Sequence, residues 1–153
     1  MIMVSNKITR KSPEIKLCSS ERYFEQILQL IENWSKFDKI KRPKMQVSVN
    51  QHSLVFLVGF PRSGTTLLDT ILRSHPETCV IEEKPTVEAM NKYLSGPATP
   101  DLLTGLNYSD IDDLKRIYFE ELYSHIAPNS QYKIIIDKHP LNLINIGIIH
   151  RVF

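Results

Sequence analysis

The residues with the clearest chemical potential are GFPRSGTT at positions 59–66, which lie between an apolar run and a helical pattern. A loop that leads from a buried strand into a helix directs several backbone N–H groups at one point, where the helix dipole also favours negative charge. Gly59 lets the chain leave the strand sharply, and Gly64 lets the backbone approach an anion without an intervening Cβ. The segment therefore predicts a phosphate-binding loop.

The same loop departs from that of the nucleotide hydrolases at one position. Its glycine spacing is that of G-x-x-x-x-G-K-[ST], but Thr65 stands where the lysine is expected. In ATP and GTP hydrolases the lysine neutralises the terminal phosphates, and the next hydroxyl binds Mg²⁺. Arg62 instead offers a planar guanidinium suited to bidentate contact with a phosphate or a sulfate. The loop therefore favours a metal-free anion over Mg²⁺-bound ATP.

The elements around the loop predict an α/β fold of the P-loop type, with three layers and a central parallel sheet between flanking helices. Apolar runs at 54–58 and 132–136 are typical of strands buried on both faces, and 79–81 predicts a shorter strand. Helices are expected over 65–73, 85–94 and 141–153. A further helix is expected to begin at a cap formed by Ser109 or Asp110 and to end at Pro128. Residues 95–107 are expected to form a loop.

Two polar segments are expected at one edge of this sheet. Ligands of parallel α/β sheets bind outside the carboxyl ends of the strands. The 59–66 loop follows one predicted strand, and Asp137-Lys138-His139 follows another. Residues 51–153 are thus predicted to form the functional domain, preceded over residues 1–50 by a polar arm, an amphipathic helix and a basic linker.

The composition narrows the class of protein. A chain of 153 residues with a formal net charge of +2 fits one globular domain and gives no argument for nucleic-acid binding. No apolar run approaches the ~18 residues of a membrane span, and the first residues lack the apolar core of a secretory signal. We expect a cytoplasmic protein in which Cys18 and Cys79 are reduced and bind no metal.

With these residues in place, the chain resembles the sulfotransferase family. The resemblance is carried by VGFPRSGTTLL at 58–68, RSHPE at 73–77, the Glu82-Glu83 pair and the segment 137–140. It is closest to the tyrosylprotein sulfotransferases and to bacterial sulfotransferases associated with tetratricopeptide repeats. The resemblance implies transfer of a sulfuryl group from 3′-phosphoadenosine 5′-phosphosulfate (PAPS) to a hydroxyl or amine acceptor, with no metal.

The resemblance also implies roles for individual residues. Glu83 takes the position of the general base, with Glu82 as the alternative, and Lys138 matches the lysine of a Lys-x-Pro element that contacts the transferring group. His139 lies one place from the histidine base of the cytosolic enzymes and is expected to form a wall of the site. The 5′-phosphosulfate end would be held by Arg62, Ser63, Gly64, Thr65 and Thr66.

Other interpretations stay open at this point. Glu83 could also be a surface carboxylate that precedes a helix. Lys138 could also be a solvated lysine that follows a strand. IIID at 134–137 resembles the Mg²⁺-binding strand of a P-loop kinase or hydrolase. The Arg-Asp-Pro element that binds the 3′-phosphate of PAPS has no counterpart before Phe153. We therefore expect the N-terminal part of a larger enzyme with little transfer activity by itself, or a non-catalytic remnant.

Overall fold

The computed structural model describes residues 24–25, 27–28, 31–32, 52–128 and 131–153. Contacts between residues divide the chain into two units, Met1–Asp38 and Lys39–Phe153. The described residues of the first unit are helical, as predicted, and Phe24, Leu28 and Ile31 are exposed there. The predicted polar arm, Cys18 and the basic linker lie outside the described residues.

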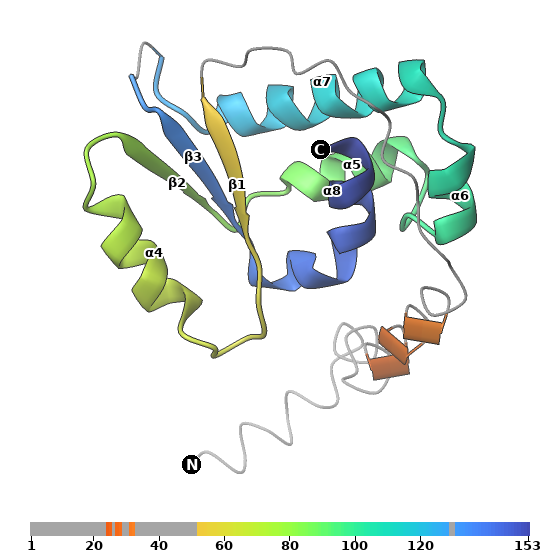
Figure 1. Ribbon diagram of the computed structural model, residues 1–153, viewed down its shortest axis with the longest axis horizontal. Coiled ribbons are helices and arrows are strands. Elements are labelled where there is room, and N and C mark those ends of the chain that lie inside the picture. Colours follow the sequence, from red (N-terminus) through yellow and green to blue (C-terminus); the bar gives the residue numbers. More distant parts are fainter. Residues whose placement is uncertain (1–23, 26, 29–30, 33–51, 129–130) are drawn as a thin grey trace, which may run out of the picture. The chain divides into compact units, whose positions relative to one another are not determined.

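A sheet of three parallel strands forms the centre of the second unit (Figure 1). The strands are β1 (Ser53–Leu57), β2 (Thr78–Glu82) and β3 (Ile134–Lys138), in the order β1-β3-β2. Helix α4 (Thr65–Arg73) joins β1 to β2, so the third strand inserts between them. The register brings Leu57, Lys138 and Glu82 side by side at the carboxyl edge.

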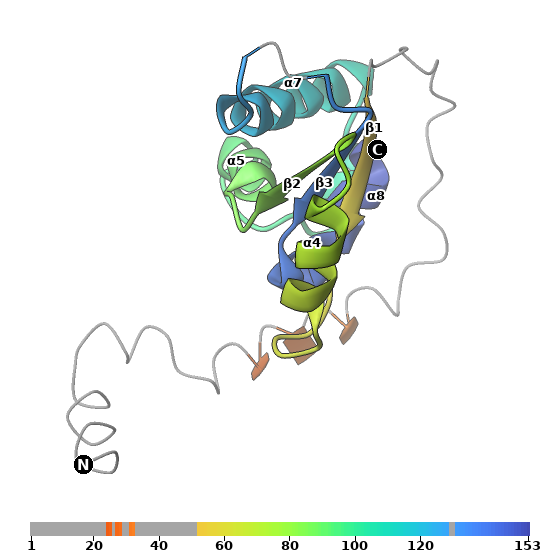
Figure 2. The same ribbon diagram turned by 90° about the vertical axis from the view of Figure 1, so that its left-hand side faces the viewer.

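Helices cover both faces of this sheet (Figure 2). Helix α4 lies on one face, while α5 (Thr86–Tyr93), α7 (Tyr108–Ser124) and α8 (Ile146–Val152) lie on the other. The second face carries the apolar core, whose fully buried members include Val87, Met90, Leu103, Leu114, Leu122, Ile148 and Val152. The predicted three-layer α/β fold is confirmed.

Strand β1 departs from the prediction of a strand buried on both faces. Among the described strands it pairs only with β3, and its residue Val55 is 44% exposed. Helix α4 does not cover it with apolar side chains, because Leu67 and Ile71 both face solvent. The buried residue of α4 is Asp69 instead, so this helix meets the sheet through a carboxylate.

Several boundaries were also predicted wrongly. β3 begins two residues later than expected, so Asp137 and Lys138 are the last residues of the strand and do not follow it. The predicted loop contains α6 (Pro100–Gly105), because Thr99 caps a helix whose first residue is proline. Asn107, and neither Ser109 nor Asp110, caps α7.

Two further differences concern the helix ends. The predicted cap Asp110 serves as the third helical residue, where its carboxylate completes a capping box with Asn107. α7 ends at Ser124, before Pro128. The predicted helix over 141–153 is split into a 3₁₀ segment, η1 (Pro140–Asn145), and α8.

Candidate active site

The 59–66 loop leaves β1 and turns tightly before α4. Arg62 and Gly64 have positive φ angles of 69° and 86°, and Gly64 begins α4 with no side-chain hydrogen bond as a cap. Backbone that alternates between left- and right-handed conformations gathers successive N–H groups into an anion-binding concavity. A Cβ added at Gly59 would lie 3.1 Å from Ser63 Oγ, so the loop folds closely onto its first residue.

The side chains of this loop are open to solvent. Arg62, Ser63 and Thr66 are exposed, and Thr65 is half-buried. The Arg62 guanidinium makes no hydrogen bond or ion pair with any residue of 52–128 or 131–153. The loop therefore presents an unpaired cation beside the N-terminus of a helix.

Backbone hydrogen bonds join the start of the loop to the end of β3. Gly59 N donates to Pro140 O at 3.2 Å, and His139 N donates to Leu57 O at 3.2 Å. Since Lys138 is paired with Leu57 in the sheet, the lysine lies at the same edge as the loop. The structure thus brings together two segments that are more than seventy residues apart in sequence.

Lys138 is the centre of a cluster of charged side chains. Its side chain is 0% exposed, and its Nζ donates to Glu82 Oε1 at 2.7 Å and to Glu83 Oε1 at 3.2 Å. Burial by itself lowers the pKa of the ammonium, but the hydrogen bonds to Glu82 and Glu83 and the negative charges of both carboxylates together outweigh that effect and leave the pKa above its ordinary value. The interpretation of Lys138 as a solvated lysine is therefore wrong.

Helix α4 adds a second ion pair to this cluster. Asp69, almost fully buried, lies 3.9 Å from Lys138 Nζ and accepts three hydrogen bonds from the Arg73 guanidinium at 2.9–3.1 Å. Arg73 also lies 3.5 Å from Glu82. The hydrogen bond from Lys138, with Arg73 nearby, holds the pKa of Glu82 below its ordinary value. Three carboxylates and two cations therefore join α4, β2 and β3.

Glu83 occupies a distinctive position just beyond β2. Its φ of 50° is left-handed, a conformation that non-glycine residues disfavour. Its N–H donates to Lys138 O at 2.7 Å, which extends the pairing of β2 with β3 by one residue. The side chain is 56% exposed, so its carboxylate reaches both Lys138 and solvent.

Asp137 lies on the opposite face of the sheet from Lys138, as neighbouring residues of a strand do. It is 1% exposed, and its Oδ2 accepts hydrogen bonds from Thr86 Oγ1 at 2.6 Å and from Tyr118 Oη at 2.8 Å. Burial raises the pKa of this carboxyl, and the two hydroxyl donors counteract part of that effect. The aspartate therefore connects β3 to α5 and α7.

His139 is half-buried, and its Nδ1 has no hydrogen-bond partner among the described residues. The 3₁₀ segment that follows turns back over it, because Asn142 N donates to His139 O at 2.9 Å. Its expected role as a wall of the site stays a prediction.

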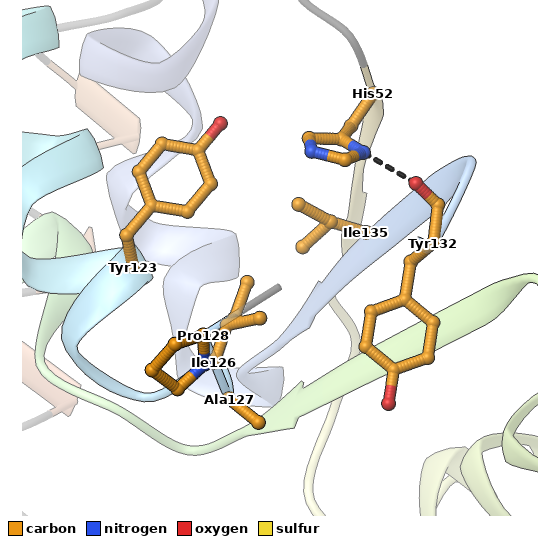
Figure 3. Close-up of a pocket in the computed structure, with 7 residues that line it drawn as sticks. All are labelled: His52, Tyr123, Ile126, Ala127, Pro128, Tyr132 and Ile135. Atoms are coloured by element: carbon orange, nitrogen blue, oxygen red, sulfur yellow. Dashed lines mark hydrogen bonds between the residues drawn. The ribbon is translucent and has the colours of Figure 1, made fainter. Parts of the chain in front are cut away.

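A pocket of about 270 Å³ lies at the other end of the strands (Figure 3). His52 precedes β1, and its Nδ1 donates a hydrogen bond to Tyr132 O, just before β3. The pocket's lining residue Ile135 lies in β3 three residues before Lys138, so about 10 Å along the strand separates the pocket from the Lys138 cluster. The other lining residues are Tyr123, Ile126, Ala127 and Pro128. It does not contain any residue of the predicted site.

Comparison with known families decides the class of this domain. A sequence model described as the sulfotransferase family matches residues 53–153, which includes the loop, the acidic pair and Lys138. The chain belongs to the sulfotransferase family. A comparison with curated proteins found no match. Membership supports a transferase that moves sulfuryl groups, and the α/β sheet described above is consistent with that family.

The described part of this sulfotransferase domain has neither a membrane-spanning helix nor a cluster of metal-binding side chains. No described helix has the length and apolar character needed to cross a membrane. In the same residues, no group of three or more His, Cys, Asp or Glu side chains is arranged to hold a metal ion. Cys79 is a free thiol, and burial raises its pKa.

Sequence reasoning missed three residues that lie beside Asp137 or in the Lys138 cluster. Asp69 and Arg73 lie four residues apart on the predicted α4, which is the spacing of an intrahelical ion pair and could have identified them. Thr86 carried no such signal, because its partner Asp137 is fifty-one residues away. Only the strand order brings that pair together.

Proposed function

We propose that this chain is part of a sulfotransferase that moves a sulfuryl group from PAPS to a hydroxyl or amine acceptor. The observation that carries the proposal is the contact of Glu83 Oε1 with Lys138 Nζ, at 3.2 Å, on the sheet edge where the 59–66 loop begins. A carboxylate and a cation held together beside an anion-binding loop supply a base and a charge-stabilising group around one point.

The loop would hold the 5′-phosphosulfate end of the donor. Uncapped N–H groups at the start of α4, and that of Gly64, can donate to its oxygens, with the hydroxyls of Thr65 and Thr66 as further donors. The Ser63 N–H, predicted as another donor, instead donates to Phe60 O at 3.1 Å. Arg62 is exposed and makes no ion pair in the described residues, so its guanidinium is available for bidentate contact with the same anion.

The transfer step would use Glu83 and Lys138. The acceptor oxygen or nitrogen attacks sulfur and passes its proton to the Glu83 carboxylate, while the bond from sulfur to the bridging oxygen of PAPS breaks. Negative charge develops on that bridging oxygen and leaves with adenosine 3′,5′-bisphosphate. Lys138 and Arg62 would stabilise this charge.

Glu82 is the alternative base, and its geometry makes it the weaker one. It lies closer to Lys138, at 2.7 Å, and also faces Arg73 at 3.5 Å. The lysine, as its main partner, lowers the pKa of Glu82, which makes the carboxylate a poorer proton acceptor. Glu83 has the longer contact with Lys138 and the more exposed side chain.

The competing proposal, a Mg²⁺-dependent kinase or hydrolase, would use Asp137 as a metal ligand. In this chain the Asp137 carboxylate is buried on the face that packs against α5 and α7, and two hydroxyls already donate to its Oδ2. That arrangement favours a structural aspartate over a metal ligand, and it supports the metal-free reaction.

Calorimetric titration with adenosine 3′,5′-bisphosphate in metal-free buffer tests the proposal. We expect the full chain to bind it and Arg62→Ala to weaken the affinity by about 10-fold to 100-fold, the loss of one charge-assisted contact. Arg116→Ala is the matched control, because Arg116 is committed to Asp113 and Glu120 on α7. Equal affinity of wild type and Arg62→Ala would remove the loop from the mechanism, and tight binding of ATP only with Mg²⁺ would favour the competing proposal.

A further inference from the structure

The turn between β2 and α5 carries Glu83, and both of its ends are attached to β3. At the first end, Glu83 N donates to Lys138 O at 2.7 Å. At the other end, the Thr86 hydroxyl donates to Asp137 Oδ2 at 2.6 Å. Only Lys84 and Pro85 lie between them. The four-residue turn 83–86 is therefore bonded at both ends to β3, at its first residue by Lys138 and at its last by Asp137.

The turn has few other restraints of its own. Glu83 adopts a left-handed φ of 50°, which its surroundings must enforce. Pro85 is the N-cap residue just before α5 and provides no side-chain hydrogen bond. The hydroxyl of Thr86, the first helical residue, instead anchors this helix start to Asp137. Thr86 and Asp137 are 0% and 1% exposed, so water does not compete for their hydrogen bond.

We propose that Asp137 is a positioning residue for sulfuryl transfer: through Thr86 it holds the β2–α5 turn so that the Glu83 carboxylate stays beside Lys138. This inference rests on the function proposed above. Asp137 touches no reacting group, because its side chain lies on the other face of the sheet. It acts on Glu83 through the backbone of the turn.

Tyr118 distinguishes positioning from simple packing. Its hydroxyl donates to the same oxygen of Asp137, at 2.8 Å, but it comes from α7 and is bonded to the aspartate and not to the turn. If Asp137 served only to satisfy buried groups, loss of either donor would have the same consequences. If it positions Glu83, only loss of the Thr86 hydroxyl disturbs the turn.

Amide hydrogen exchange at Glu83, followed by NMR in the full chain, tests this distinction. Thr86→Val keeps the shape of the side chain and removes the hydroxyl, and we expect it to raise the exchange rate of the Glu83 amide about tenfold. Thr86→Ser restores the hydroxyl and should return the rate to within about twofold of wild type. Tyr118→Phe should leave it equally unchanged.

The same variants are then compared in turnover of PAPS, measured as release of adenosine 3′,5′-bisphosphate with 4-nitrophenol as the probe acceptor. We expect Thr86→Val to lower kcat about tenfold at an unchanged KM for PAPS, and Thr86→Ser to recover it. An unchanged exchange rate in Thr86→Val, or an equal rise in Tyr118→Phe, would overturn the inference. Absence of turnover and of bisphosphate binding in the wild type would instead refute the proposed function, and the exchange rates would still decide whether Asp137 holds the turn.

Discussion

Replacing Lys138 with methionine tests the charged cluster most directly, because it removes the charge and keeps a side chain of similar length. Lys138 Nζ lies 2.7, 3.2 and 3.9 Å from carboxylate oxygens of Glu82, Glu83 and Asp69. At these distances each attraction is worth about 1–1.5 kcal/mol at the dielectric constant of water, and several times more in a drier environment.

Two effects reduce the net cost of Lys138→Met. The buried ammonium no longer has to be desolvated, which recovers several kcal/mol in order of magnitude. Glu82 and Glu83 keep about half of their side-chain surface in water, so they are rehydrated when the lysine is removed, and Asp69 keeps Arg73. We therefore expect the free energy of unfolding to fall by about 2 kcal/mol at pH 7, less than for a fully buried pair.

The cost of Lys138→Met should also depend on pH. Lys138 lowers the pKa of Glu82, so in the wild type Glu82 contributes stability above its ordinary pKa of about 4.3 and loses that contribution as the pH falls through the lower folded value. The variant lacks the share of this contribution that comes from Lys138, while Arg73 still lies near Glu82. The difference between the two proteins should therefore be smaller at pH 3 than at pH 7.

Urea unfolding of both proteins at the two pH values measures these differences. Lys92→Met is the control, because it breaks an exposed pair with Glu88 on α5 and should leave the urea midpoint unchanged. The reasoning would be refuted if Lys138→Met lowered the free energy of unfolding by less than about 0.5 kcal/mol at pH 7, or by the same amount at pH 3 as at pH 7. The charge of Lys138 would then contribute no measurable stability, because methionine keeps the apolar part of the side chain.

Three further predictions concern the backbone, the buried acid and a helix cap. Gly64→Ala places a Cβ on a residue with a φ of 86°, so it should lower the free energy of unfolding by about 1–2 kcal/mol and weaken bisphosphate binding. Gly105→Ala, at a site with open space and no positive φ, should change neither quantity. Urea unfolding and calorimetric titration measure the two effects. Burial raises the pKa of Asp137, so the wild type loses stability as the pH rises above about 3.9 and this carboxyl ionises. The free energy of unfolding of Asp137→Asn relative to wild type should therefore increase from pH 4 to pH 7. A difference that does not change with pH would contradict this prediction. Asn107→Ala should lower the free energy of unfolding by about 1 kcal/mol, measured in urea, because the capping box of α7 loses one member.

Local patterns in the sequence predicted much of the scaffold. The α4 helix was predicted over 65–73 and lies there, because its periodicity and the glycine before it are properties of neighbouring residues. The four buried residues Ile111, Leu114, Tyr118 and Leu122 of α7 follow the same rule. The cap of α7 and the whole of α6 were missed, although Asn107 with Asp110 and Thr99 with Pro100 carry recognisable signals.

The sequence by itself determined the loop, its missing lysine, the acidic pair and the family, because each depends on residue types at short spacing. Only the tertiary structure decided what surrounds Lys138. The order β1-β3-β2 places Glu82 in register with Lys138, and that pairing follows from how strands from distant segments associate. The same order buries Asp137 against Thr86, since a one-residue step along a strand moves a side chain to the other face of the sheet.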